Sequence, residues 1–198
     1  SVAVRTLTKA DDEEGDDNTG EEESEYLIYE DFEDYLKDEY LAKTGGSYWT
    51  TWSNKPGSSE DAKVVELDGN KCAYMTYGVD QVLLLGGYQS GTFDLEFEVL
   101  VPNGSTGYLN VLHEFAGNNS KWALQAYLQA TDTGDGNPVM APGHGSVHAG
   151  SAETADIPCV YDAWMHFRIH VDADTDVAQL YYTMPNGEET KACEWQWS

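Results

Sequence analysis

The stretch Thr92–Val99 reads Thr-Phe-Asp-Leu-Glu-Phe-Glu-Val, an unbroken alternation of apolar and mostly acidic side chains. Successive side chains of a β-strand point to opposite faces of its sheet, so the stretch predicts a strand with one buried and one solvated face. A second clean alternation spans Trp164–Asp172, with Met165, Phe167, Ile169 and Val171 on its apolar side. Strands of this half-buried kind are therefore expected to organise the fold.

Further alternations predict more strands, and turn-forming residues separate them. Because 92–99, 107–115 and 122–129 follow one another through short turns, we expect them to form one antiparallel meander. Residues 131–158 are rich in Gly, Pro, Thr, Asp and Ser and predict a long irregular excursion, with one weak strand near 145–148. The remaining expected strands are 62–67, 71–77, 177–183 and 191–197.

The number and spacing of these strands indicate an all-β protein. Eight or more short strands with turns at regular spacing are typical of a sandwich or a barrel, and two packed sheets suit the length. Only Glu33–Lys43, followed by Gly45, has the pattern of a short helix. The predicted fold is a two-sheet antiparallel jelly-roll β-sandwich.

The chain has 198 residues, of which 36 are acidic and 10 basic, for a net charge of −26. Such a chain offers no basic stripe to neutralise a phosphate backbone, so nucleic acid is excluded as a partner. The same field repels anionic membranes. No apolar run approaches the roughly 20 residues that cross a bilayer, so no transmembrane segment is expected.

The acidic residues are concentrated at the start of the chain. Residues 1–25 carry ten acids and two bases, and no large apolar side chain lies between Ala10 and Glu25. Dense like charges repel one another and extend a chain. We expect residues 1–25 to be a flexible acidic tether and residues 26–198 to be one domain.

Five segments resemble the jelly rolls of the concanavalin A-like lectin/glucanase superfamily, and more narrowly the LamG-like domains of secreted and surface proteins of Bacteroidetes. They are Glu30–Glu33, Trp49–Ser53, Gly91–Phe97, Gly107–His113 and Ala178–Tyr182. This resemblance covers about residues 28–198. It implies an extracellular or cell-surface location, and the acidic segment resembles the spacer after the lipidated cysteine of surface lipoproteins. The superfamily includes lectins, hydrolases, lyases and adhesion domains, so activity stays open.

The polar side of each alternation defines a candidate ligand-binding face. Carboxylates and amides match the donors and acceptors of sugar hydroxyls, and tyrosine rings stack on the apolar faces of pyranoses. A glycan or polysaccharide is therefore the expected partner of a non-catalytic binding or adhesion module. The alternative is a structural protein-interaction domain without a small ligand. The expected contacts are Glu96, Asn110, Gln125, Tyr127, His166 and Arg168.

Two catalytic alternatives use the same face. Retaining glycosidases place two carboxyl groups about 5–5.5 Å apart, and side chains two apart on a strand, such as Glu96 and Glu98, lie roughly 7 Å apart. Laminarinase-type glucanases carry Glu, Asp and Glu at alternating strand positions, whereas this chain has Asp94 first and Glu96 second. The set Gln125, Tyr127, His166 and Arg168 resembles that of jelly-roll alginate lyases, but one Arg beside three acids is a poor receptor for uronates.

Two smaller features concern metal and cysteine chemistry. Asp172, Asp174 and Asp176 alternate like the start of a calcium loop but lack the Gly and Glu of an EF-hand. A structural Ca²⁺ is accordingly the one cofactor considered. The odd count of cysteines, Cys72, Cys159 and Cys193, leaves at least one thiol outside any disulfide within the chain.

Overall fold

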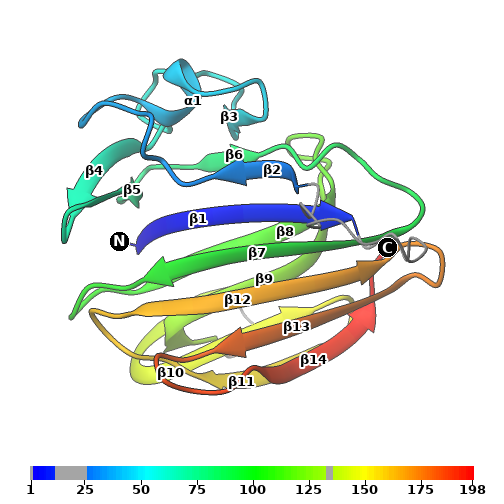
Figure 1. The fold of residues 1–198 in the computed structure, drawn as a ribbon. Coiled ribbons are helices and arrows are strands. Elements are labelled where there is room, and N and C mark those ends of the chain that lie inside the picture. The colour runs from blue at the N-terminus through cyan, green and yellow to red at the C-terminus, as the bar shows by residue number, and fades with distance from the viewer. Residues whose placement is uncertain (1, 12–25, 133–135) are drawn as a thin grey trace, which may run out of the picture.

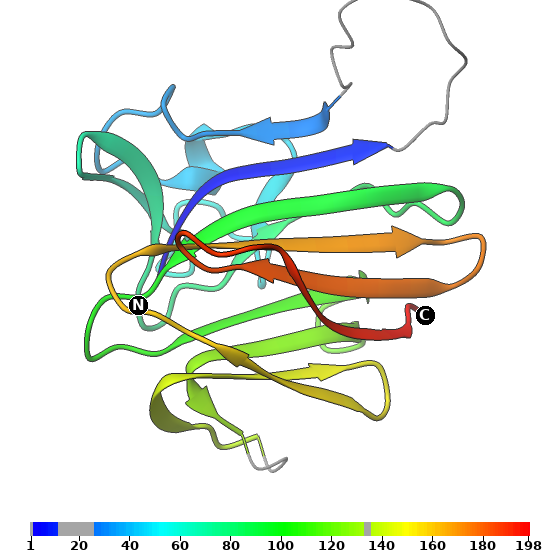
Figure 2. The same ribbon diagram turned by 60° about the horizontal axis from the view of Figure 1, so that its bottom comes forward.

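The computed structural model describes residues 2–11, 26–132 and 136–198, and its main feature is two β-sheets packed face to face (Figure 1). Figure 2 separates the two layers, with β10 and β11 below β12 and β13. All strand pairs of both sheets are antiparallel. The expected all-β class and the sandwich of two antiparallel sheets are thus confirmed.

The large sheet has eight strands and the small sheet four. The large sheet runs in the order β4 (Lys63–Leu67), β5 (Asn70–Met75), β1 (Val2–Asp11), β7 (Thr92–Leu100), β12 (Trp164–Asp172), β13 (Val177–Thr183) and β14 (Thr190–Gln196), with β2 (Tyr26–Glu30) also paired to β1. The small sheet runs in the order β8 (Gly107–Glu114), β9 (Lys121–Thr131), β10 (Val139–Ala149) and β11 (Glu153–Pro158).

The main core lies between the two sheets and is built from the apolar sides of the predicted alternations. Phe97 of β7 and Phe167 of β12 are paired in register, and their rings stack with centroids 5.6 Å apart. Leu124 and Leu128 of β9 are fully buried opposite them. Burial of this apolar area, at about 25 cal/mol per Å², is the main force that holds the sheets together.

A smaller cap, residues 31–62 with β6 (Gln81–Leu83), covers the β4–β5 end of the large sheet. It contains β3 (Trp49–Thr51), which pairs with β6, and the short helix α1 (Leu41–Thr44). The cap has its own apolar cluster around Phe32, Leu41 and Trp49. The predicted helix at Glu33–Lys43 is therefore wrong except for its last residues, because the preceding segment instead forms turns.

The structure corrects the expected tether. Residues 2–11 form β1, which lies inside the large sheet between β7 on one side and β5 and β2 on the other. All ten acids of the first 25 residues lie at positions 11–25. Counting charge over the whole segment therefore concealed that residues 2–10 have a composition compatible with a strand. Residues 12–25 lie outside the described residues.

The expected meander is also wrong, because β7 belongs to the large sheet whereas β8 and β9 belong to the small one. The connection passes through Val101, which is completely buried and accepts a hydrogen bond from the backbone of Asp162. A period of two identifies a strand but not its sheet. The chain therefore crosses from the large sheet to the small sheet between residues 100 and 107.

The expected excursion at 131–158 is instead the hairpin of β10 and β11. β10 pairs with β9 on its other edge, with an irregularity between Met140 and Gly145 that contains Gly143 at a φ of +81°. Pairing on both edges overrides the weak strand propensity of a Gly-rich segment. Within the described residues, no helix has the length and apolar character needed to traverse a bilayer.

Candidate functional site

The outer face of the large sheet carries half of the predicted ligand contacts. In the β7–β12 ladder, Arg168 is opposite Glu96 and His166 is opposite Glu98. His166 Nε2 lies 3.3 Å from Glu96 Oε1, and His170 Nδ1 lies 3.0 Å from Asp94 Oδ1. The alternation therefore predicted the shared face of these side chains correctly.

Arg168 is engaged by groups of its own chain. Its guanidinium donates to both carboxylate oxygens of Glu189, at 3.0 and 2.7 Å, and to Asp94 at 3.2 Å. It also lies over the Tyr181 ring, 4.2 Å from the centroid. Hydrogen bonding to Glu189 raises the pKa of Arg168, and the same bond lowers the pKa of Glu189. A guanidinium used in this way is a poor receptor for a ligand anion.

The outer face of the small sheet carries the other half of the predicted contacts. Tyr108 is opposite Tyr127, and Asn110 is opposite Gln125. The Tyr108 hydroxyl donates to Gln125 Oε1 at 2.8 Å, and the Tyr108 and Tyr127 rings are tilted with centroids 5.1 Å apart. His148 of β10 meets the Tyr127 ring edge-on. We name Tyr108, Asn110, Gln125 and Tyr127 the tyrosine–amide patch.

The six predicted ligand contacts are therefore not brought together. Glu96, His166 and Arg168 are on the outside of one sheet, whereas Asn110, Gln125 and Tyr127 are on the outside of the other, with the core between them. The reason is the crossing of the chain between β7 and β8. The expectation of a single polar face is therefore wrong, because these residues belong to two different sheets.

A group of tryptophans adjoins the patch along β9. The ladder skips Ala123, which is buried, so that Trp122 pairs with Leu112. Trp122 is 45 % exposed and stacks on Trp52 of the cap, with centroids 6.1 Å apart. An unbroken alternation with Leu124, Ala126 and Leu128 would place Trp122 on the buried side of β9, and this bulge turns it outward instead.

A cleft of about 690 Å³ lies between β8 and residues 79–89. Its floor reaches core residues Leu95 and Phe97, and its walls include Tyr108 and Asn110 of the tyrosine–amide patch. β8 is an edge strand of the small sheet, so the cleft opens where that sheet ends. Apolar walls with a few polar groups are typical of ligand sites.

Asp80 is one of the two acidic residues that line this cleft. Its backbone is held on both sides, since its N–H donates to Glu60 and its carbonyl accepts from Trp52. Burial, followed by repulsion from Glu60, raises the pKa of the Asp80 carboxyl above its ordinary value. Burial also raises the pKa of Tyr108 to about 12. The local sequence Val79-Asp80-Gln81 does not indicate that Asp80 lines a cleft. Its position there depends on backbone hydrogen bonds with Trp52 and Glu60 of the cap.

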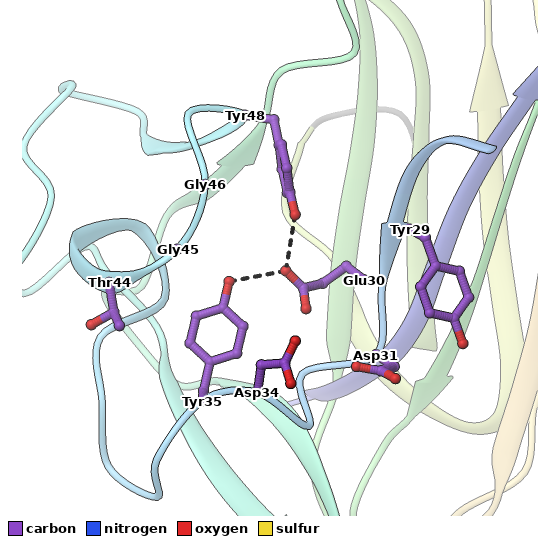
Figure 3. A pocket seen from close by; sticks show the side chains of 9 residues that line it. All are labelled: Tyr29, Glu30, Asp31, Asp34, Tyr35, Thr44, Gly45, Gly46 and Tyr48. Atoms are coloured by element: carbon purple, nitrogen blue, oxygen red, sulfur yellow. Dashed lines mark hydrogen bonds between the residues drawn. The ribbon is translucent and has the colours of Figure 1, made fainter. Parts of the chain in front are cut away.

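A second cavity, of about 480 Å³, surrounds Glu30 (Figure 3). The Glu30 carboxylate is only 6 % exposed and accepts hydrogen bonds from Phe32 N, Tyr35 Oη and Trp49 Nε1 at 2.9, 2.9 and 3.1 Å. The Tyr48 hydroxyl lies 3.5 Å away. Burial and Glu30 together raise the pKa of Tyr35 and of Tyr48. Glu30 thus ties the start of the cap to β3, a role not predicted from the sequence.

Neither cavity is lined by Glu96 or Glu98, the expected carboxyl pair of a hydrolase. Glu96 contacts His166, and Glu98 is adjacent to it on the same exposed face of β7. A glycosidase needs its two carboxyl groups on either side of a bound sugar. The surroundings of these two residues therefore offer less support for hydrolysis than the sequence suggested.

The three aspartates considered as calcium ligands accept hydrogen bonds from nearby groups at the turn between β12 and β13. Asp172 accepts from the backbone of residues 174 and 175, Asp174 accepts from Gly91, and Asp176 accepts from Ser198. These bonds lower the pKa of Asp172 and Asp176. In the part of the chain that the structure describes, no three His, Cys, Asp or Glu side chains converge on a metal position.

The three cysteines lie in different parts of the fold. Cys72 is in β5 and Cys193 is in β14, toward opposite ends of the large sheet. Cys159 is buried in the core. All three cysteines are thiols, and the structure contains no disulfide among its described residues.

Cys193 is expected to react slowly with alkylating agents. Burial raises its pKa to about 11 from a usual 9.0, so the thiolate fraction at pH 8 falls by about 100-fold. Iodoacetamide labelling followed by peptide mass spectrometry measures this rate. Denaturant is expected to restore rapid labelling of all three cysteines. Rapid labelling of Cys193 in the folded protein contradicts its placement.

Comparison with protein-family models, curated proteins and solved structures yields no match for this chain.

Proposed function

We propose that this chain is a non-catalytic carbohydrate-binding or adhesion module whose ligand lies against the tyrosine–amide patch. The observation that carries the proposal is the grouping of Tyr108, Asn110, Gln125 and Tyr127 at facing positions of β8 and β9, beside the cleft between β8 and residues 79–89. An extracellular or cell-surface location is part of the proposal, as the resemblance to concanavalin A-like jelly rolls implies.

The chemistry of the patch supports this choice. Two tyrosine rings supply apolar surface for stacking, and two amides supply donors and acceptors for hydroxyl groups. The Tyr108–Gln125 hydrogen bond fixes the ring and the amide relative to each other before any ligand arrives. Groups fixed in advance lose less entropy on binding, which favours affinity.

The proposal predicts that Tyr127→Ala and Gln125→Ala each lower affinity for a glycan ligand by about tenfold, because each removes a stacking or hydrogen-bonding partner. The measurement is a glycan-array screen of residues 1–198, with and without Ca²⁺, followed by calorimetry on any ligand found.

Tyr77→Ala and Gln179→Ala are matched controls. Tyr77 is fully exposed and does not line either cavity, and Gln179 is on the outer face of the large sheet. Equal loss of binding in these controls, or unchanged binding in the patch variants, overturns the proposed site. If no neutral or acidic glycan binds, a protein-interaction domain is favoured. If a bound glycan is cleaved and a product is released, the hydrolase is favoured.

A further inference from the structure

The described residues that line the cleft between β8 and residues 79–89 include no lysine or arginine, and His113 is the one histidine among them. Two acids line it, Asp80 and Glu114. Glu114 is neutralised by Lys121, at 2.6 Å, outside the cleft wall. Among the described residues, no donor reaches the Asp80 carboxylate, so it is the one carboxylate of the wall without a partner.

Several aromatic rings line the same cleft as Asp80. Trp52 is bonded to the backbone of Asp80, packs on Phe115 with centroids 5.5 Å apart, and lines the cleft with it. Tyr108 lines the β8 wall of the same cleft. Aromatic faces attract cations, and a nearby carboxylate adds a direct counter-charge. Both features favour a positively charged group in the cleft.

We propose that the cleft binds the ammonium group of an amino sugar, with Asp80 as counter-ion and Trp52 and Tyr108 as aromatic walls. This inference rests on the proposed function, because it names the class of sugar that the module takes. An ammonium group donates three hydrogen bonds, which the carboxylate accepts. Uronic acids and sulfated sugars are disfavoured by the same carboxylate and by the net charge of −26.

Asp80 has a side chain that is exposed at the cleft and receives no hydrogen bond in the described structure. The cleft walls partly desolvate its carboxylate, which mildly disfavours the charged form in the folded protein. The raised pKa is the sign of this penalty: the native state favours the protonated form, so the penalty is fully present above the folded pKa and absent below the unfolded one. Asp80→Asn is therefore expected to unfold at no lower temperature than the natural chain at pH 7.

The experiment compares oligosaccharides that differ only at the amino position. Glucosamine and galactosamine tetramers, their N-acetylated forms and the corresponding glucose and galactose tetramers are titrated into the full chain at pH 6.5 and 0.15 M salt. The free-amine forms are expected to bind at least about tenfold more tightly than the hydroxyl forms. Asp80→Asn is expected to abolish this preference without loss of thermal stability.

Asp68→Asn is the matched control, because it removes the same charge from the β4–β5 turn, away from the cleft. It is expected to keep the preference, which separates the cleft from general attraction to an acidic protein. Equal or tighter binding of the hydroxyl or N-acetyl forms, or a preference that survives Asp80→Asn, overturns the inference and leaves the proposed function standing. Absence of binding by every oligosaccharide here and on the glycan array counts against both.

Discussion

Glu30→Ala is expected to lower the free energy of unfolding by about 3–5 kcal/mol, because each buried donor left without an acceptor costs about 1–3 kcal/mol. The carboxylate accepts from the Tyr35 hydroxyl and the Trp49 indole, both in the apolar cluster of the cap, and from the Phe32 backbone. Alanine removes the acceptor while these donors stay buried. Chemical denaturation followed by tryptophan fluorescence measures the loss.

Two further variants test whether the hydrogen bonds are the cause. Glu30→Gln keeps one acceptor oxygen and nearly the same volume, so a smaller loss than for alanine is expected. Glu188→Ala removes an exposed acid from the turn before β14 and is expected to change stability by about 0.5 kcal/mol at most. A Glu30→Ala variant as stable as Glu188→Ala contradicts the buried role of Glu30.

Phe167→Ala is expected to cost about 3–5 kcal/mol of unfolding free energy, the usual range for removing a buried phenylalanine. Phe167 is 1 % exposed, stacks on Phe97 across the β7–β12 ladder, and belongs to the core between the two sheets. The substitution leaves a cavity whose walls come from both sheets. Their strands are fixed by backbone hydrogen bonds and cannot move far to fill it.

Equilibrium denaturation at 25 °C tests this prediction. Phe167→Leu, which keeps most of the volume, is expected to cost less, and Tyr77→Ala, which removes a fully exposed ring, is expected to be nearly neutral. A loss below about 1 kcal/mol for Phe167→Ala is incompatible with close packing of the sheets at this position.

The strands themselves were predictable because their side chains alternate. The predicted strand 164–172 coincides with β12, and 177–183 coincides with β13. The pairing of strands was not predictable, because alternation carries no information about partners distant in the chain. The hairpin of β10 and β11 shows this limit: its Gly-rich sequence forms strands because β9 supplies an edge.

The candidate site was predictable by residue type and by face, but not as an assembly. Gln125 and Tyr127 were expected beside Arg168, which the crossing of the chain between β7 and β8 places on the opposite side of the core. Asp80 and Glu30 escaped prediction because their surroundings come from the cap. The indole of Trp49 is brought to Glu30, and the backbone of Trp52 to Asp80, only by folding.

The central position of β1 also determines the order in which the large sheet can be completed. Val4 pairs with Val99, so β1 has no principal neighbour to pair with until about ninety more residues have been synthesised. Such distant pairings slow folding, because the loop entropy must be lost before the contacts form. Until β1 pairs with them, β5 and β7 each present an open strand edge to which another chain can add. A shortened chain that starts at residue 26 keeps those edges permanently, and its solubility depends on what covers them.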